Sequence, residues 1–157
     1  MALSQTALQG VLSEATSAVF LETLTITHSD FTTLQLVNDY QDLVRNQGTF
    51  SAFPFQVRGG QNDGESPPSL KINADIVDQR IIEALRTAAG KREKPIITYE
   101  VVLAQSPDTI EFGPMEFQFG AVSTDGLTTA TITATFLPGA LNDAFPSLQF
   151  APSNASE

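Results

Sequence analysis

The sequence contains no cysteine and no tryptophan, and its single histidine is His28. Without cysteine the chain has no disulfides, no thiolate metal ligands and no thiol nucleophile. A zinc site would need mostly carboxylate ligands from this chain, so structural zinc is not expected. We therefore predict no metal site and no cofactor.

Basic residues are also scarce, with eight Lys and Arg against eighteen Asp and Glu and a formal net charge of −10. This balance repels nucleic-acid phosphates and anionic lipid headgroups, so we expect no nucleic-acid binding. The first residues, MALSQTALQGVLSEAT, lack a basic leader, and no apolar run approaches the roughly 20 residues of a membrane helix. We predict a protein made in the cytoplasm, with no membrane segment.

No sequence motif of a known catalytic class is present. DxDxDG, HExxH, GxSxG and GxGxxG are all absent. His28, Ser29 and Asp30 are adjacent in one turn, whereas the members of a catalytic triad come from separated segments. We predict that the chain is not an enzyme, although its carboxylates are numerous enough for a chance glycosidase-like pair. They include Glu22, Asp39, Asp42, Glu100, Asp108, Glu111 and Glu116.

The 157 residues fit a single domain, residues 1–157, and a hydrophobic fraction of 41% with 17% charged residues is typical of a globular fold. A helix is predicted over 75–89, with Asp75 as its N-cap and Gly90 at its end. Its apolar stripe is Val77, Ile81, Leu85 and Ala88, with Ile82 beside them. Ser4 is expected to cap a weaker helix over 4–15, and 58–69 is expected to be an exposed loop.

Alternating and β-branched segments predict six or seven strands, most of them joined as hairpins. Asp125-Gly126 indicates a tight turn, and after it Ala130, Ile132, Ala134 and Phe136 form a dry face. The predicted fold is mainly β (α+β): an antiparallel sandwich or partly closed barrel with one firm helix packed against it. The strands are placed at 18–28, 32–39, 48–57, 95–104, 109–122 with a break at Gly113-Pro114, and 127–136.

The strand GTFSAFPFQV, residues 48–57, is apolar on both faces. Phe53, Phe55 and Val57 share one face, while Phe50 and Pro54 lie on the other. One explanation is cover by a neighbouring subunit or by the chain's own C-terminal segment, 138–157, which mixes Pro and Asn with isolated Leu and Phe. The other is cover by the helix and strands of the same domain.

Several segments, taken in order, resemble an uncharacterised family of tailed-bacteriophage tail proteins, a domain of unknown function. The resemblance covers about Ser17 to Ala155. It implies a virion structural component of the tail tip, and the order of elements is similar to the β-barrel domains of distal tail and hub proteins. The matching segments are VFLETLTITH, LVND, TFSAFPFQV, NADIVDQRIIEALR, ITYEVVLAQSPDTIEFGPMEF and NDAFPSLQFAPSNA.

On this resemblance the chain joins the tail tube to the tip and fibre apparatus as a subunit of a homo-oligomeric ring, a trimer or hexamer. The expected partners are the tube, hub and fibre proteins, and the expected location is the virion tail tip. An extended arm, 138–157, is expected to dock on a neighbour. The candidate inter-subunit contacts are Phe50, Phe53, Phe55, Leu141, Phe145, Leu148 and Phe150.

The alternative function is a receptor- or carbohydrate-binding β module on the virion. The absence of Trp, the presence of only two Tyr and the lack of a calcium motif count against it.

Overall fold

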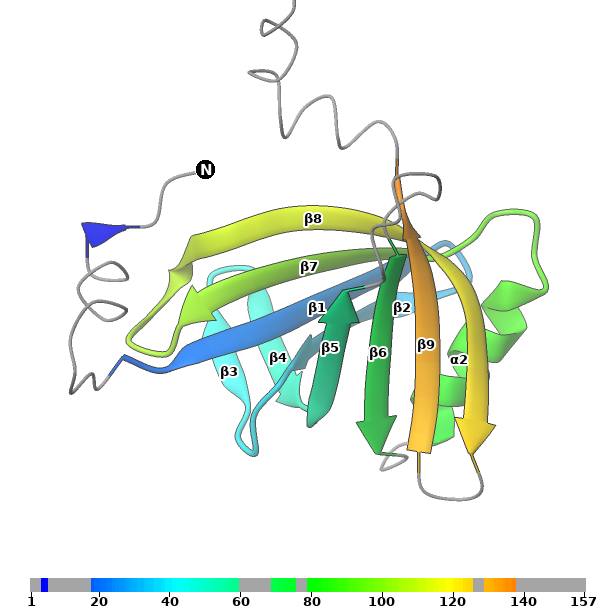
Figure 1. Ribbon diagram of the computed structural model, residues 1–157, viewed down its shortest axis with the longest axis horizontal. Coiled ribbons are helices and arrows are strands. Elements are labelled where there is room, and N and C mark those ends of the chain that lie inside the picture. Colours follow the sequence, from blue (N-terminus) through cyan, green and yellow to red (C-terminus); the bar gives the residue numbers. More distant parts are fainter. Residues whose placement is uncertain (1–3, 6–17, 60–68, 76–78, 126–128, 138–157) are drawn as a thin grey trace, which may run out of the picture.

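The computed structural model describes residues 4–5, 18–59, 69–75, 79–125 and 129–137 (Figure 1). Within these ranges the chain forms one nine-stranded sheet and one helix, which confirms the predicted mainly β class. The strands are β1 (Phe20–His28), β2 (Phe31–Val37), β3 (Leu43–Arg45), β4 (Gly48–Ala52), β5 (Phe55–Gly59), β6 (Ser69–Asp75), β7 (Ile96–Leu103), β8 (Ser106–Asp125) and β9 (Thr129–Phe136), and the helix is α2 (Gln79–Ala89).

The strands lie in the order β3-β4-β2-β1-β7-β8-β9-β6-β5. All neighbouring pairs are antiparallel except β2 and β4, which are parallel, so the sheet is mixed. Residues from both halves of this order contribute to one core, because the sheet curls around a common interior without closing (Figure 1). The sheet is therefore curled but not closed, which corresponds to the predicted partly closed barrel and not to the sandwich.

The segment GTFSAFPFQV is two strands, so the prediction of one strand over 48–57 is wrong. β4 lies beside β2 in one half of the sheet, whereas β5 forms the edge of the other half. The break falls at Phe53 and Pro54 because proline has no N–H to donate to a strand ladder. The Phe53 N–H instead donates to the Val37 carbonyl at 2.9 Å.

The main core fills the interior of the curled sheet. Phe53 and Phe55 both belong to it, at 5% and 4% exposure. Leu85 of α2 enters the same cluster, so the helix packs against the interior face. The other buried members are Leu24, Ile26, Leu36, Leu70, Ile72, Ala74, Ile97, Phe117, Phe119, Ile132, Ala134 and Phe136.

A second, smaller core lies on the opposite face of the sheet, under the β3–β4 hairpin. Val37 belongs to it while the preceding Leu36 belongs to the main core, and successive side chains of a strand point to opposite faces. Phe50 is its largest member and is fully buried. Both apolar faces of GTFSAFPFQV are thus covered by the chain's own elements. The members are Leu21, Val37, Phe50 and Val102, with Leu43 packed against them.

A buried ion pair joins the hairpin to the sheet beside this second core. The Arg45 guanidinium donates to Glu100 Oε2 at 2.8 Å, and the two side chains are 1% and 9% exposed. The guanidinium also lies over the Phe50 ring, 4.9 Å from its centre. At the hairpin turn, the Asn46 N–H donates to Asp108 Oδ1 at 2.6 Å. These contacts fix the hairpin over the outer face of the sheet.

Helix α2 begins at Gln79, not near the predicted cap at Asp75. Asp75 is the last residue of β6 and is paired with Thr129 of β9, so a strand ends where the sequence indicated a helix cap. Of the predicted apolar stripe, Ile82, Leu85 and Ala88 are buried and Ile81 is half-buried, whereas Val77 lies outside the described residues. No helix in the described ranges is long and apolar enough to cross a membrane.

The last three strands form the antiparallel hairpins that the sequence predicts. The dry face of β9 is confirmed, with its four predicted residues buried. β8 continues through the expected break because Gly113 has a φ of +97°, where a Cβ would lie 2.6 Å from the Tyr99 carbonyl oxygen. Two strands, β3 and β6, were absent from the predicted set.

Candidate ligand-binding pocket at the sheet seam

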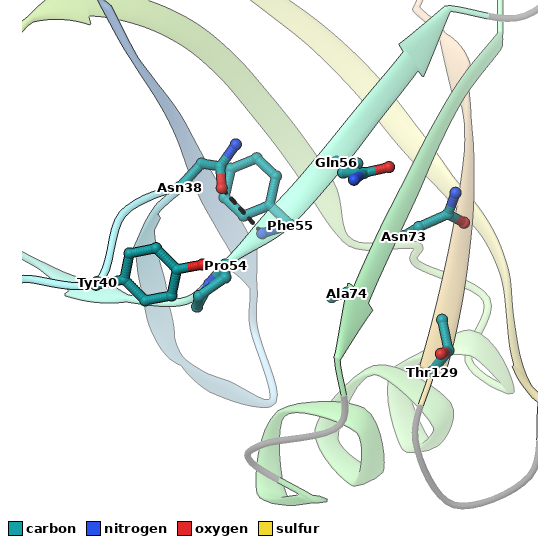
Figure 2. Close-up of a pocket in the computed structure, with 8 residues that line it drawn as sticks. All are labelled: Asn38, Tyr40, Pro54, Phe55, Gln56, Asn73, Ala74 and Thr129. Atoms are coloured by element: carbon teal, nitrogen blue, oxygen red, sulfur yellow. Dashed lines mark hydrogen bonds between the residues drawn. The ribbon is translucent and has the colours of Figure 1, made fainter. Parts of the chain in front are cut away.

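The chain crosses from one half of the sheet to the other at a seam formed by Val37–Asn38 and Phe53–Phe55. Asn38 Oδ1 accepts a hydrogen bond from the Phe55 N–H at 3.1 Å, so a side chain replaces a ladder bond that a closed sheet would make (Figure 2). The Asn38 amide nitrogen Nδ2 donates to Glu22 Oε2 at 2.8 Å. The orientation of the Asn38 amide is therefore fixed from both ends.

Glu22 connects the seam to the interior. Its Oε1 accepts a hydrogen bond from the Tyr99 hydroxyl at 2.8 Å. Burial, together with the hydrogen bond and the negative charge of Glu22, raises the pKa of Tyr99 well above its usual range. Tyr99, Glu22 and Asn38 form a polar chain that stabilises the seam.

A pocket of about 470 Å³ opens at this seam, beside β5 and β6 (Figure 2). Its volume is within the range of small-molecule sites, roughly 300–1,000 Å³. Of the eight lining residues that the structure describes, five are polar and none is charged. The residues are Asn38, Tyr40, Pro54, Phe55, Gln56, Asn73, Ala74 and Thr129 (Figure 2).

One wall of the pocket is aromatic. Tyr40 is 89% exposed and lies beside Pro54, with its ring on the open side (Figure 2). Its N–H donates to Asp39 Oδ1 at 2.7 Å, which fixes the turn after β2. An exposed aromatic ring next to a proline offers a flat apolar surface to a ligand.

The other wall is a row of polar side chains from neighbouring strands. Gln56 of β5 is directly opposite Asn73 of β6, and Asn73 is opposite Thr131 of β9. The Thr131 hydroxyl donates to Asn73 Oδ1 at 3.0 Å, which leaves the N–H groups of that amide as donors. The Gln56 amide makes no hydrogen bond within the described ranges. This wall can both donate and accept hydrogen bonds.

A basic pair lies next along the same face. Arg58 and Lys71 are directly opposite each other in the β5–β6 register, one step beyond Gln56 and Asn73. Two residues along a strand span roughly 7 Å, so the pair borders the pocket. Both side chains are exposed, and neither forms an ion pair with any described residue.

The candidate contacts predicted from sequence fall into two groups. Phe50, Phe53 and Phe55 are buried in the chain's own cores, and only Phe55 also reaches the pocket. The explanation by cover within the domain therefore holds for these three, which present little side-chain surface to a neighbour. The remaining four, Leu141, Phe145, Leu148 and Phe150, lie outside the described residues.

His28 has a structural environment. Its Nδ1 accepts from the Asp30 N–H at 3.1 Å, and its Nε2 bonds to the Glu93 carbonyl at 3.0 Å. The Ser29 hydroxyl donates to the Glu93 carboxylate at 3.1 Å and not to the imidazole. The arrangement is not that of a catalytic triad.

Six of the seven carboxylates considered as catalytic candidates accept hydrogen bonds from groups that hold the fold together. The described residues also contain no cluster of three or more His, Cys, Asp or Glu side chains that could hold a metal ion. The partners are Tyr99 and Asn38 for Glu22, Tyr40 for Asp39, Ala52 for Asp42, Arg45 for Glu100, Asn46 for Asp108, and Ser4 for Glu111.

Comparison with known proteins identifies the family. Residues 6–150 match the family described as "Domain of unknown function (DUF1833)". The chain belongs to this family. The match agrees with the predicted membership of a domain of unknown function and covers the sheet together with most of the C-terminal segment. No curated protein matches the chain.

A solved structure shares the fold of this DUF1833 chain. It is a component of the "Virion of native gene transfer agent (GTA) particle", with a TM-score of 0.61 and 18% sequence identity. The superposition covers 88% of this chain and 46% of that chain. This chain therefore spans about half the length of that virion component, and the likeness is one of fold.

Proposed function

We propose that this chain is a structural subunit at the tail tip of a bacteriophage or phage-like virion, in a distal tail or hub ring that joins the tail tube to the tip and fibre apparatus. The observation that carries the proposal is the shared fold, over 88% of this chain, with a component of a gene transfer agent virion. The order of the sequence segments supports the same class. The role is structural and involves no catalysis.

The open sheet suits assembly into a ring. A ring is built from heterologous contacts, in which two different patches of each subunit meet. Strands β3 and β5 are the two edges of the sheet, and an edge strand presents unpaired N–H and C=O groups to another chain. Val44 in β3 is 71% exposed and supplies an apolar contact at one edge. The ring we propose is a trimer or hexamer.

Net charge supports the same role. A formal charge of −10 repels DNA phosphates, so a lumen lined by such subunits lets DNA pass without adhering.

We propose that residues 138–157 dock on a neighbouring subunit through Leu141, Phe145, Leu148 and Phe150. Burial of each such side chain is worth about 1.5–3 kcal/mol, so exposure of all four in a finished virion is unfavourable. The described chain already fills both cores without these residues.

Truncation after Pro138 tests the proposal. We expect the shortened chain to remain folded and soluble by circular dichroism, while tails assembled with it lack a functional tip in electron micrographs. Aggregation or unfolding of the isolated shortened chain contradicts the docking role and assigns the segment to the subunit's own core. Normal tips built with the shortened chain contradict the docking role of the segment, whereas normal tips that do not contain the chain contradict the tail-tip function itself.

A further inference from the structure

The pocket at the seam has features that the structural role leaves unexplained. A subunit contact needs no concave surface lined by uncharged amides and one exposed aromatic ring. Tyr40 is one of only two tyrosines in the chain, and at 89% exposure its ring contributes little to the fold. An exposed aromatic ring beside hydrogen-bonding groups suits a ligand with one apolar and one polar face.

Saccharides have this character. The C–H face of a pyranose ring packs on an aromatic ring, while each hydroxyl both donates and accepts hydrogen bonds. The amides of Gln56 and Asn73 offer donors and acceptors from adjacent strands, on the far side of Pro54 and Phe55 from the ring of Tyr40 (Figure 2). None of the lining residues that the structure describes is charged, which suits the neutral hydroxyls of a sugar.

The basic pair at the border of the pocket specifies the ligand further. Like charges directly opposite on neighbouring strands destabilise a sheet, so Arg58 and Lys71 weaken the β5–β6 pairing. Neither has an acidic partner among the described residues. An anionic group of a ligand placed between them relieves this repulsion.

We propose that the seam pocket and the basic pair together bind an acidic saccharide. One sugar ring packs on Tyr40, and the adjoining unit places its hydroxyls on Gln56 and Asn73 and its carboxylate between Arg58 and Lys71. The spacing agrees with this arrangement, because the basic pair is two residues along the strands, roughly 7 Å, from the amides. The repulsion between this carboxylate and the chain's acidic residues elsewhere is screened beyond about 8 Å at physiological salt.

The test compares matched pairs of probes on the isolated full-length chain. Digalacturonate is paired with neutral galabiose, which differs from it only in the carboxylates, and sialyllactose with lactose, which lacks the whole acidic sugar. Binding is measured by saturation-transfer-difference NMR and calorimetry at millimolar concentrations. We expect at least one acidic probe to bind, and to bind roughly tenfold more tightly than its neutral partner.

Variants assign the contacts. Tyr40→Ala is expected to abolish binding of acidic and neutral probes alike. Lys71→Gln is expected to weaken the binding of only the acidic probe, by roughly tenfold. The matched control is Lys91→Gln, which also removes one positive charge, and binding should be unchanged because the Lys91 Nζ lies 3.7 Å from Asp30 Oδ2, outside the proposed site. Failure of both acidic probes to bind overturns the proposal, as does binding that survives Tyr40→Ala. Equal affinity for acidic and neutral probes overturns the role of the basic pair. None of these results depends on assembly into tails.

Discussion

Replacement of Phe50 by alanine distinguishes a contact within the chain from a contact between subunits. The Phe50 side chain is 0% exposed and packs with Leu21, Val37 and Val102 under the β3–β4 hairpin. Its ring also lies beneath the Arg45 guanidinium. If this second core is part of the isolated fold, Phe50→Ala leaves a cavity in it and exposes the buried ion pair.

The expected loss is large. A buried Phe→Ala substitution costs about 3–5 kcal/mol of unfolding free energy. For a domain of this size that corresponds to a fall in melting temperature of roughly 6–20 °C. The matched control is Val44→Ala on the same hairpin, because Val44 is 71% exposed and its truncation should change stability by less than about 0.5 kcal/mol.

Urea unfolding followed by circular dichroism measures both variants, at concentrations where light scattering shows a monomer. Circular dichroism is the suitable signal because the chain has no tryptophan. A Phe50→Ala variant within about 1 kcal/mol of the parent chain refutes the second core. That result would mean that the hairpin does not pack on the sheet in solution and that Phe50 is available to a neighbouring subunit.

The remaining predictions concern the ion pair, the alkaline limit and the long loop. Glu100→Leu leaves the Arg45 guanidinium buried without a partner and should lower the unfolding free energy by about 3–5 kcal/mol. The double variant Arg45→Leu with Glu100→Leu should recover most of that loss. A double variant no more stable than Glu100→Leu contradicts the prediction. The raised pKa of Tyr99 means that the unfolded chain loses this proton first above about pH 10, so stability should fall as pH rises further. In Tyr40→Phe, phenolate absorbance should therefore appear together with unfolding, and its appearance near pH 10 in the folded chain would be contrary evidence. Replacement of 61–66 by a Gly-Ser linker of equal length should shift the melting temperature by less than about 2 °C, because the strands on either side of this segment already pair in the β5–β6 ladder. Loss of soluble protein would show that the segment is required for folding.

Elements with a strong local pattern could be predicted from the sequence. The dry face of β9 alternates at every second residue, and the β1–β2 hairpin has its turn at Ser29 and Asp30. In both cases the residues that decide the structure are adjacent in the chain. Local alternation and turn chemistry therefore suffice.

The errors occur where distant pairing decides the structure. Asp75 resembles a helix cap, but the β6 ladder to β9 extends through it, and its partner Thr129 lies 54 positions later, from 75 to 129. Residues 48–57 resemble one strand, yet Pro54 separates two strands at distant positions in the sheet. A sequence window contains neither long-range partner.

The pocket could not be predicted for the same reason. Its polar residues come from the turn after β2, from β5, from β6 and from the start of β9, and no two of these segments form a motif. One signal was available, since Tyr40 is a rare tyrosine in a polar turn, NDYQD. The basic pair carried no signal, because the register that places Arg58 opposite Lys71 is known only from the folded sheet.

The pocket and the last described residues before the C-terminal segment lie at opposite ends of β9. Thr129, at the start of the strand, lines the pocket, whereas Phe136 ends the strand and residues 138–157 follow it. Eight residues of β-strand span about 25 Å. A neighbour that contacts only the Phe136 end of the strand leaves the pocket uncovered, whereas a neighbour on the β5 edge borders it. On this arrangement a ring of subunits presents one saccharide site per copy, and repeated weak contacts of this kind bind a polysaccharide surface with far higher avidity than any single site.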